Sequence, residues 1–137
     1  MSLKLLLPLL LIAGAAAAET ITLDTETCTA TNICFQVPND QSESVEFISN
    51  AVQYRRLVIS INGDIFDTGL WALASPPATP VGSTTTYTQS ATLYDPNGNA
   101  VAGSLNWRIV VGAKCLQSGR VCVFPRTVTL LGGTLAR

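Results

Sequence analysis

Histidine is absent from the 137 residues of this chain. Its absence removes the commonest general base and the commonest zinc ligand. Lysine is scarce as well, because Lys114 is the only one after the N-terminal segment that carries Lys4. The sequence also has no Gly-x-Ser-x-Gly elbow and no glycine-rich phosphate loop. These absences favour a protein that is not an enzyme and that carries no cofactor.

Charged residues are few, at 12%, whereas hydrophobic residues make up 47%. Disordered chains have the opposite balance, so the composition indicates a folded domain with a hydrophobic core. Basic residues are too few and too scattered for a nucleic-acid-binding patch, and the acidic residues oppose one.

Long apolar runs are also missing. The longest, Leu5 to Ile12, is shorter than the roughly 20 residues that span a bilayer. It follows Lys4 and precedes small residues that end at Ala18, which is the pattern of a secretory signal peptide. We expect residues 1–18 to be a signal peptide cleaved after Ala18. Residues 19–137 would then form a single β domain, secreted or periplasmic, with no transmembrane segment.

The charges that are present are distributed unevenly. Residues 19–67 hold eight acidic and two basic residues, whereas residues 100–137 hold five basic residues and no acidic one. One interpretation is that N- and C-terminal strands lie side by side and neutralise each other. The other is a dipolar surface that steers a protein partner or a second copy of the chain.

Short alternating apolar segments between turn signals predict strands throughout. Leu57 to Ile61 is a strong β run, and Asn62-Gly63 after it predicts a hairpin into a segment that continues from Asp64 to Ala74. Residues 84–94 predict a long threonine-rich strand, and residues 101–111 alternate with period two. The predicted fold is all-β: a small antiparallel β-sandwich of roughly seven or eight strands, with a β-barrel as the alternative.

Four cysteines occur as Cys28-x₅-Cys34 and Cys115-x₆-Cys122. Structural zinc sites use shorter spacings, and thioredoxin-type redox pairs use Cys-x-x-Cys, so neither is expected. In an exported chain an even number of cysteines predicts disulfides, here two, and no bound metal.

Four cysteines allow three pairings. Ser118-Gly119 predicts a two-residue turn that places Cys115 opposite Cys122, and Cys28 and Cys34 can close in the same way. We therefore favour the local pairs 28–34 and 115–122, and the alternative links the N-terminal hairpin to the C-terminal one. A local loop of about seven residues contributes roughly 2.4 kcal/mol, against about 4.7 for a loop near 90. Local disulfides would stiffen turns for presentation, so Gln117, Ser118, Gly119 and Arg120 are candidate binding residues.

Alternating hydroxyls along residues 84–92 form a second candidate surface, with Thr84, Thr86 and Thr88 as its candidate binding residues. Such a row binds ordered water or sugar, or it is the solvent face of an edge strand. Four aromatic residues, at positions 71, 87, 94 and 107, form either a sugar-stacking platform or part of the core.

Acidic residues offer two weaker alternatives. Asp24 with Glu26, or Asp64 with Asp67, would be the carboxylate pair of a small hydrolase, although acids at such spacing are ordinary surface and turn residues. Asp95-x-Asn-x-Asn resembles the start of a calcium loop, but the glycine and glutamate that complete such a loop are missing.

The sequence thus predicts an exported, non-enzymatic domain. It would act through protein–protein interaction or self-assembly, as a structural protein of the envelope or extracellular space. The alternatives are a carbohydrate-binding or enzyme-inhibitor module, and a small hydrolase with paired carboxylates.

Overall fold

The computed structural model describes residues 18–23, 27–29, 31–116 and 119–137. Within these ranges the regular structure is entirely β, as predicted, with no helix and hence none that could cross a lipid bilayer. The strands number twelve rather than seven or eight, because several predicted strands are broken into shorter ones. They are β1 (Ala18–Leu23), β2 (Thr27–Thr29), β3 (Asn32–Gln36), β4 (Ser44–Phe47), β5 (Gln53–Ile61), β6 (Asp64–Asp67), β7 (Trp71–Leu73), β8 (Thr84–Tyr94), β9 (Ala100–Val111), β10 (Lys114–Leu116), β11 (Val121–Val123) and β12 (Arg126–Ala136).

Ten strands form one sheet in the order β1-β5-β6-β8-β9-β12-β3-β2, with β4 on β12 and β7 on β5. The path is open at β1 and β2, so among the described strands the barrel alternative is wrong. All the pairs are antiparallel except β1 with β5, which run parallel. Parallel neighbours need a long connection, here the chain from β1 through β4.

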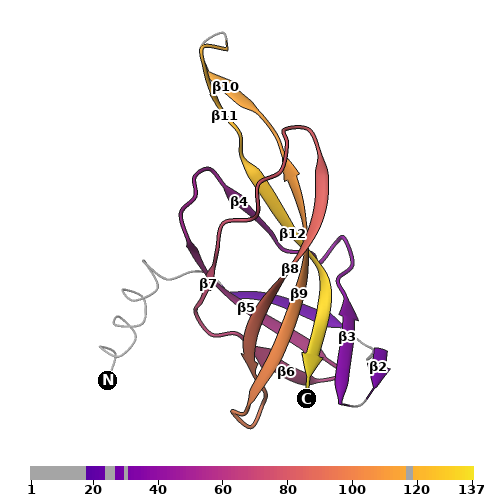
Figure 1. Ribbon diagram of the computed structural model, residues 1–137. Helices are drawn as coiled ribbons and strands as arrows, with labels where there is room; N and C mark the ends of the chain where they lie inside the picture. Colours follow the sequence, from indigo (N-terminus) through magenta and orange to yellow (C-terminus); the bar gives the residue numbers. More distant parts are fainter. Residues whose placement is uncertain (1–17, 24–26, 30, 117–118) are drawn as a thin grey trace, which may run out of the picture.

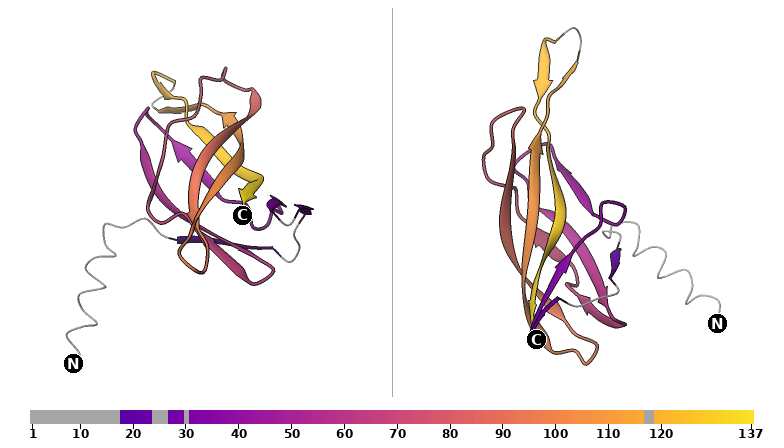
Figure 2. Two further views of the ribbon diagram at one scale, coloured as in Figure 1. Left: turned by 60° about the horizontal axis from the view of Figure 1, so that its bottom comes forward. Right: turned by 90° about the vertical axis from the view of Figure 1, so that its right-hand side faces the viewer.

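The sheet bends into two layers that cross at a steep angle (Figures 1 and 2). One layer holds β3, β4, β8, β9 and β12, with β2 beside β3 at its edge, and the other holds β1, β5, β6 and β7. A single residue pair, Asp67 with Tyr94, joins β6 to β8 between them. The fold is therefore the predicted β-sandwich, and its two layers are joined at one corner, where β6 pairs with β8.

The core lies between the layers and follows from the alternation of β9. Its odd-numbered residues are all buried, and Trp107, the largest, is only 2% exposed. Gly103 continues this buried row because a Cβ there would lie 2.5 Å from Leu93 Cδ1. Gly103 therefore allows β8 and β9 to pack closely at this position.

Asn62-Gly63 forms the predicted hairpin turn between β5 and β6. Both residues have positive φ, 52° and 89°, as a type I′ turn requires. The strand predicted to continue to Ala74 instead breaks after Asp67. Thr68 Oγ1 accepts the Leu57 N–H at 2.8 Å and donates to the Gly69 carbonyl at 2.8 Å. The chain turns at Gly69, where φ is 62°, and resumes as β7 on another part of β5.

β12 changes its partner halfway along. Its first residues pair with β4 and its last five with β3, while β9 lies on its other side throughout. The register with β9 shifts at Leu131, which is a β-bulge, and the Leu131 carbonyl accepts the Val37 N–H at 2.7 Å. Two close-packed glycines, Gly132 and Gly133, follow the bulge.

Candidate functional site

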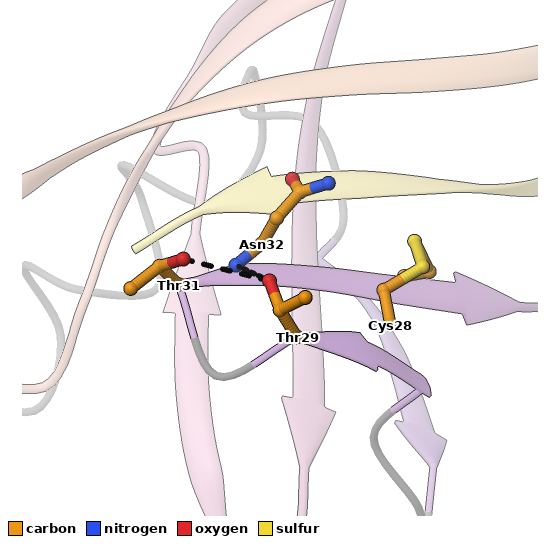
Figure 3. Close-up of a disulfide and its surroundings, with 5 residues drawn as sticks. Cys28, Thr29, Thr31 and Asn32 are labelled. Atoms are coloured by element: carbon orange, nitrogen blue, oxygen red, sulfur yellow. Dashed lines mark hydrogen bonds between the residues drawn. A yellow bond between two sulfur atoms is a disulfide. The ribbon is translucent and has the colours of Figure 1, made fainter.

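Both local disulfides predicted from the sequence are present. Cys28 bonds to Cys34 across the β2–β3 turn, with a Cα–Cα distance of 5.4 Å (Figure 3). Thr29 Oγ1 accepts the Asn32 N–H at 3.1 Å and lies 3.4 Å from the Thr31 hydroxyl, so the turn is also held by hydrogen bonds. The alternative pairing between the two hairpins is therefore wrong.

The second disulfide, Cys115–Cys122, closes a two-stranded arm. Cys115 lies directly opposite Cys122 in the β10–β11 register, with a Cα–Cα distance of 4.0 Å. Figures 1 and 2 show this hairpin extending beyond the sandwich, at the end opposite the C-terminus. Of the predicted binding residues, Gly119 and Arg120 are exposed near its tip, and Gln117 and Ser118 lie outside the described residues.

One face of the arm is apolar and exposed. Leu116 pairs with Val121, and Val123 follows on the same face because side chains alternate along a strand. Their exposed fractions are 65%, 56% and 37%. We call Leu116, Val121 and Val123 the arm face. The disulfide occupies the other face, so it stiffens the hairpin without covering these side chains.

The base of the arm is tied to the sandwich. Lys114 Nζ lies 3.1 Å from Glu46 Oε2 on β4, and the Gly112 N–H donates to the Pro125 carbonyl at 3.0 Å. Arg126, directly after the arm, donates to the Ser49 carbonyl at 2.6 Å. These contacts on both strands fix the direction in which the arm projects.

A second exposed apolar surface lies on the outer side of the β5–β7 pair. Tyr54 pairs with Ala72, Val52 lies two residues before Tyr54, and Leu70 lies two residues before Ala72. Val52, Tyr54 and Leu70 are each at least half exposed. We call these three residues the β5–β7 surface. Neither apolar surface is predicted from the sequence, because the exposure of an apolar side chain depends on what packs against its strand.

The predicted row of hydroxyls is present on β8, with Thr84, Thr86 and Thr88 all exposed. Thr86 and Thr88 line a groove of about 530 Å³ on the outer side of the β8–β9–β12–β3 layer, and Thr84 does not. Asn106 of β9 and Gln36 of β3 line the same groove. The structure therefore brings two of the three predicted threonines together with amide side chains.

The predicted carboxylate pair does not form from Asp64 and Asp67, because each binds its own arginine. Asp64 Oδ2 lies 2.7 Å from Arg137, and Asp67 Oδ2 lies 2.6 Å from Arg56. The hydrogen bond from Arg56 lowers the pKa of Asp67. The other pair, Asp24 and Glu26, lies outside the described residues.

The possible calcium loop is a simple turn. Asp95 Oδ1 accepts the N–H groups of Asn97 and Asn99 at 3.0 and 2.8 Å, which is an Asx-type arrangement. Among the described residues, no three His, Cys, Asp or Glu side chains gather where they could hold a metal.

The uneven charges are partly neutralised across the fold. Lys114 with Glu46 and Arg137 with Asp64 each join a C-terminal base to an N-terminal acid. This favours the interpretation in which N- and C-terminal strands are neighbours, since β12 lies between β9 and both β3 and β4.

The four aromatic residues do not form a platform. Trp107 is buried, Trp71 and Tyr87 pack against the core, and Tyr94 is 48% exposed. Burial raises the pKa of Tyr87 to about 12, with a smaller opposing effect of Arg126.

Comparisons with protein-family models, curated proteins and solved structures found no match to this chain.

Proposed function

We propose that this protein is an exported, non-enzymatic β-domain that assembles with copies of itself through the arm. The observation that carries the proposal is the exposed arm face on a hairpin closed by a disulfide. Three large apolar side chains that are held away from the core do not stabilise the folded domain by burial. Exposed apolar clusters of this kind are characteristic of interaction sites.

The energetics fit an association site. Fully burying a valine or leucine side chain that was fully exposed contributes about 1.5–3 kcal/mol. The arm-face side chains, which are 37–65% exposed, would each contribute part of that. Association costs free energy when flexible groups become ordered, and the disulfide lowers that cost by fixing the hairpin beforehand. The contacts of Lys114 and Arg126 at the base have the same effect on the direction of the arm.

A second copy is the partner that we propose, because the same chain offers a complementary surface. The β5–β7 surface presents Val52, Tyr54 and Leu70, which lie on a different part of the molecule from the arm. Two different surfaces on each copy are what a head-to-tail contact needs, and such contacts repeat into rings or filaments. Tyrosine is also among the residues enriched at interface centres.

The location that we propose is the periplasm or the cell exterior. Disulfides persist in oxidising compartments, and this chain holds two among its described residues. The signal-peptide pattern of residues 1–18 supports export. A self-assembling domain there would serve as a structural component of the envelope or the extracellular space.

Sedimentation velocity tests the proposal on the mature protein over a range of concentrations. We expect wild type to form oligomers as concentration rises and the double variant L116S/V121S to remain monomeric. The variant I65S is the matched control, because Ile65 is 49% exposed but belongs to neither apolar surface. A wild-type protein that stays monomeric at the highest concentration, or that binds only a different protein, would contradict self-assembly.

A further inference from the structure

The groove on the outer side of the β8–β9–β12–β3 layer forms a site separate from the arm. It is open to solvent and has a volume of about 530 Å³, which is within the range of small-ligand sites. Four strands contribute to it, so its shape is set by the sheet rather than by a loop. Its lining is Phe35, Gln36, Val37, Thr86, Tyr87, Thr88, Asn106, Leu131 and Gly132.

The groove follows a row of four paired residues on neighbouring strands, and one of the four is a glycine. Thr88 lies opposite Asn106, Asn106 opposite Gly132, and Gly132 opposite Gln36, which forms a line across four strands. Gly132 has no side chain, and a Cβ there would collide with the backbone of Phe35. The bulge at Leu131 places an extra, half-buried apolar side chain beside this gap. Bulges often occur where a strand is shaped for a site.

The polar groups at the groove are neutral and face solvent. Thr88 Oγ1 donates to Asn106 Oδ1 at 3.0 Å, which leaves the Asn106 amide N–H groups to serve as donors. Gln36 and Thr86 are exposed on the two sides of the gap. The residues that line the groove are uncharged, and Arg108 lies opposite Thr86 at its edge.

A second row of hydroxyls lies next to the groove. Ser90 is opposite Ser104, and Ser104 is opposite Thr134, on the same face of the same strands. The two rows are two residues apart along each strand, or about 7 Å. The polar surface therefore extends beyond the groove, along the direction of the strands.

We propose that this groove binds a neutral carbohydrate chain. Amide and hydroxyl side chains match the alternating donors and acceptors of sugar hydroxyls, and Leu131 with the threonine methyl groups offers apolar contact for a sugar ring. The open groove and the adjoining row of hydroxyls suit a chain better than a single enclosed sugar. Because the lining residues are uncharged, the ligand that we propose is a neutral glycan.

Isothermal titration with mature wild-type protein tests this inference, using a soluble neutral β-glucan, a neutral mannan and anionic alginate as probes. We expect at least one neutral polysaccharide to bind and alginate not to bind. The variant N106A/T88V should weaken that binding by at least about tenfold, because it removes two hydrogen-bonding groups. The control T92V changes a threonine on the same face of β8 that is not part of the groove lining, and it should bind like wild type.

The inference would be overturned by no binding of either neutral polysaccharide, by stronger binding of alginate, or by binding that N106A/T88V leaves unchanged. Displacement of the bound polysaccharide by neutral extended peptides at equal concentration would also overturn it. Thermal unfolding of each variant establishes that it is folded before titration. The arm variant L116S/V121S should bind carbohydrate normally, so failure of self-assembly and failure of the groove are distinguishable.

Discussion

Arg56 and Asp67 form an ion pair between the neighbouring strands β5 and β6. Arg56 Nη2 lies 2.6 Å from Asp67 Oδ2, and Arg56 Nε lies 3.1 and 3.2 Å from the two carboxylate oxygens. Asp67 Oδ1 also accepts the Gly69 N–H at 2.8 Å. The carboxylate therefore joins the β5–β6 pair to the turn that begins the path to β7.

This arrangement predicts a pH-dependent contribution to stability. The pKa of Asp67 is lower in the folded state than its ordinary value of 3.8, so the unfolded state takes up the proton first as pH falls. The stabilisation should be complete at neutral pH and lost as pH falls below about 3.8. Urea unfolding of wild type and D67N across this range checks it. The difference between them should shrink toward pH 2, and a constant difference would contradict the assignment.

Tyr87 predicts the opposite dependence at high pH. Its folded pKa of about 12 lies above the ordinary 10.0, so the folded state resists losing the proton and stability should fall as pH rises from 10 to 12. The absorbance of phenolate follows this directly. Subtracting the titration of Y87F from that of wild type should leave one step with a midpoint near 12, and a midpoint near 10 would show that Tyr87 is not buried.

Substitution of Gly133, the second glycine after the bulge, should greatly reduce the stability of the fold. A Cβ at Gly133 would collide with the Ser104 carbonyl on β9, which is backbone and cannot move aside. G133A should lower the free energy of unfolding by at least about 2 kcal/mol. G112A is the matched control, because a Cβ at Gly112 meets nothing within 4 Å. It should change stability by less than about 0.5 kcal/mol. Equal losses for the two variants would contradict the close approach of β12 to β9.

The disulfide of the arm predicts a local effect. Replacing both cysteines in C115S/C122S should speed hydrogen exchange at the amides of Leu116 and Val123 and weaken self-association, because the arm face loses its preorganisation. The core should keep its protection, since β10 and β11 pair only with each other among the described strands. The comparison variant C28S/C34S leaves the arm intact. Loss of protection throughout β9 in C115S/C122S would contradict a locally acting disulfide.

The sequence predicts the features of this fold that depend on neighbours along the chain. The alternation of apolar residues identifies the buried face of β9. Asn62-Gly63 identifies a hairpin, because both residues readily adopt positive φ angles. The cysteine pairs follow from the length of the turns between them. Each of these depends on residues within about a dozen positions of one another. Such contacts leave a periodic or compositional trace in the sequence.

Other features depend on contacts that the sequence does not mark. The parallel pairing of β1 with β5 involves no short turn that could be recognised in the sequence. The end of β6 depends on the hydrogen bond that the Thr68 hydroxyl accepts from the Leu57 N–H. The groove requires the bulge at Leu131 to lie beside Asn106, which only the register of β12 determines. The arm face is exposed because no strand of the sandwich covers it, and Leu116 alone cannot reveal that.

Site-specific photo-cross-linking at Val121 tests the central claim most directly. A photoreactive residue at this exposed position of the arm, in mature protein at a concentration that supports oligomers, should form cross-links between copies. Mass spectrometry should place them in the segment 52–73, which holds Val52, Tyr54 and Leu70. Cross-links confined to the same chain, or joining copies anywhere outside that segment, would contradict assembly of the arm on the β5–β7 surface.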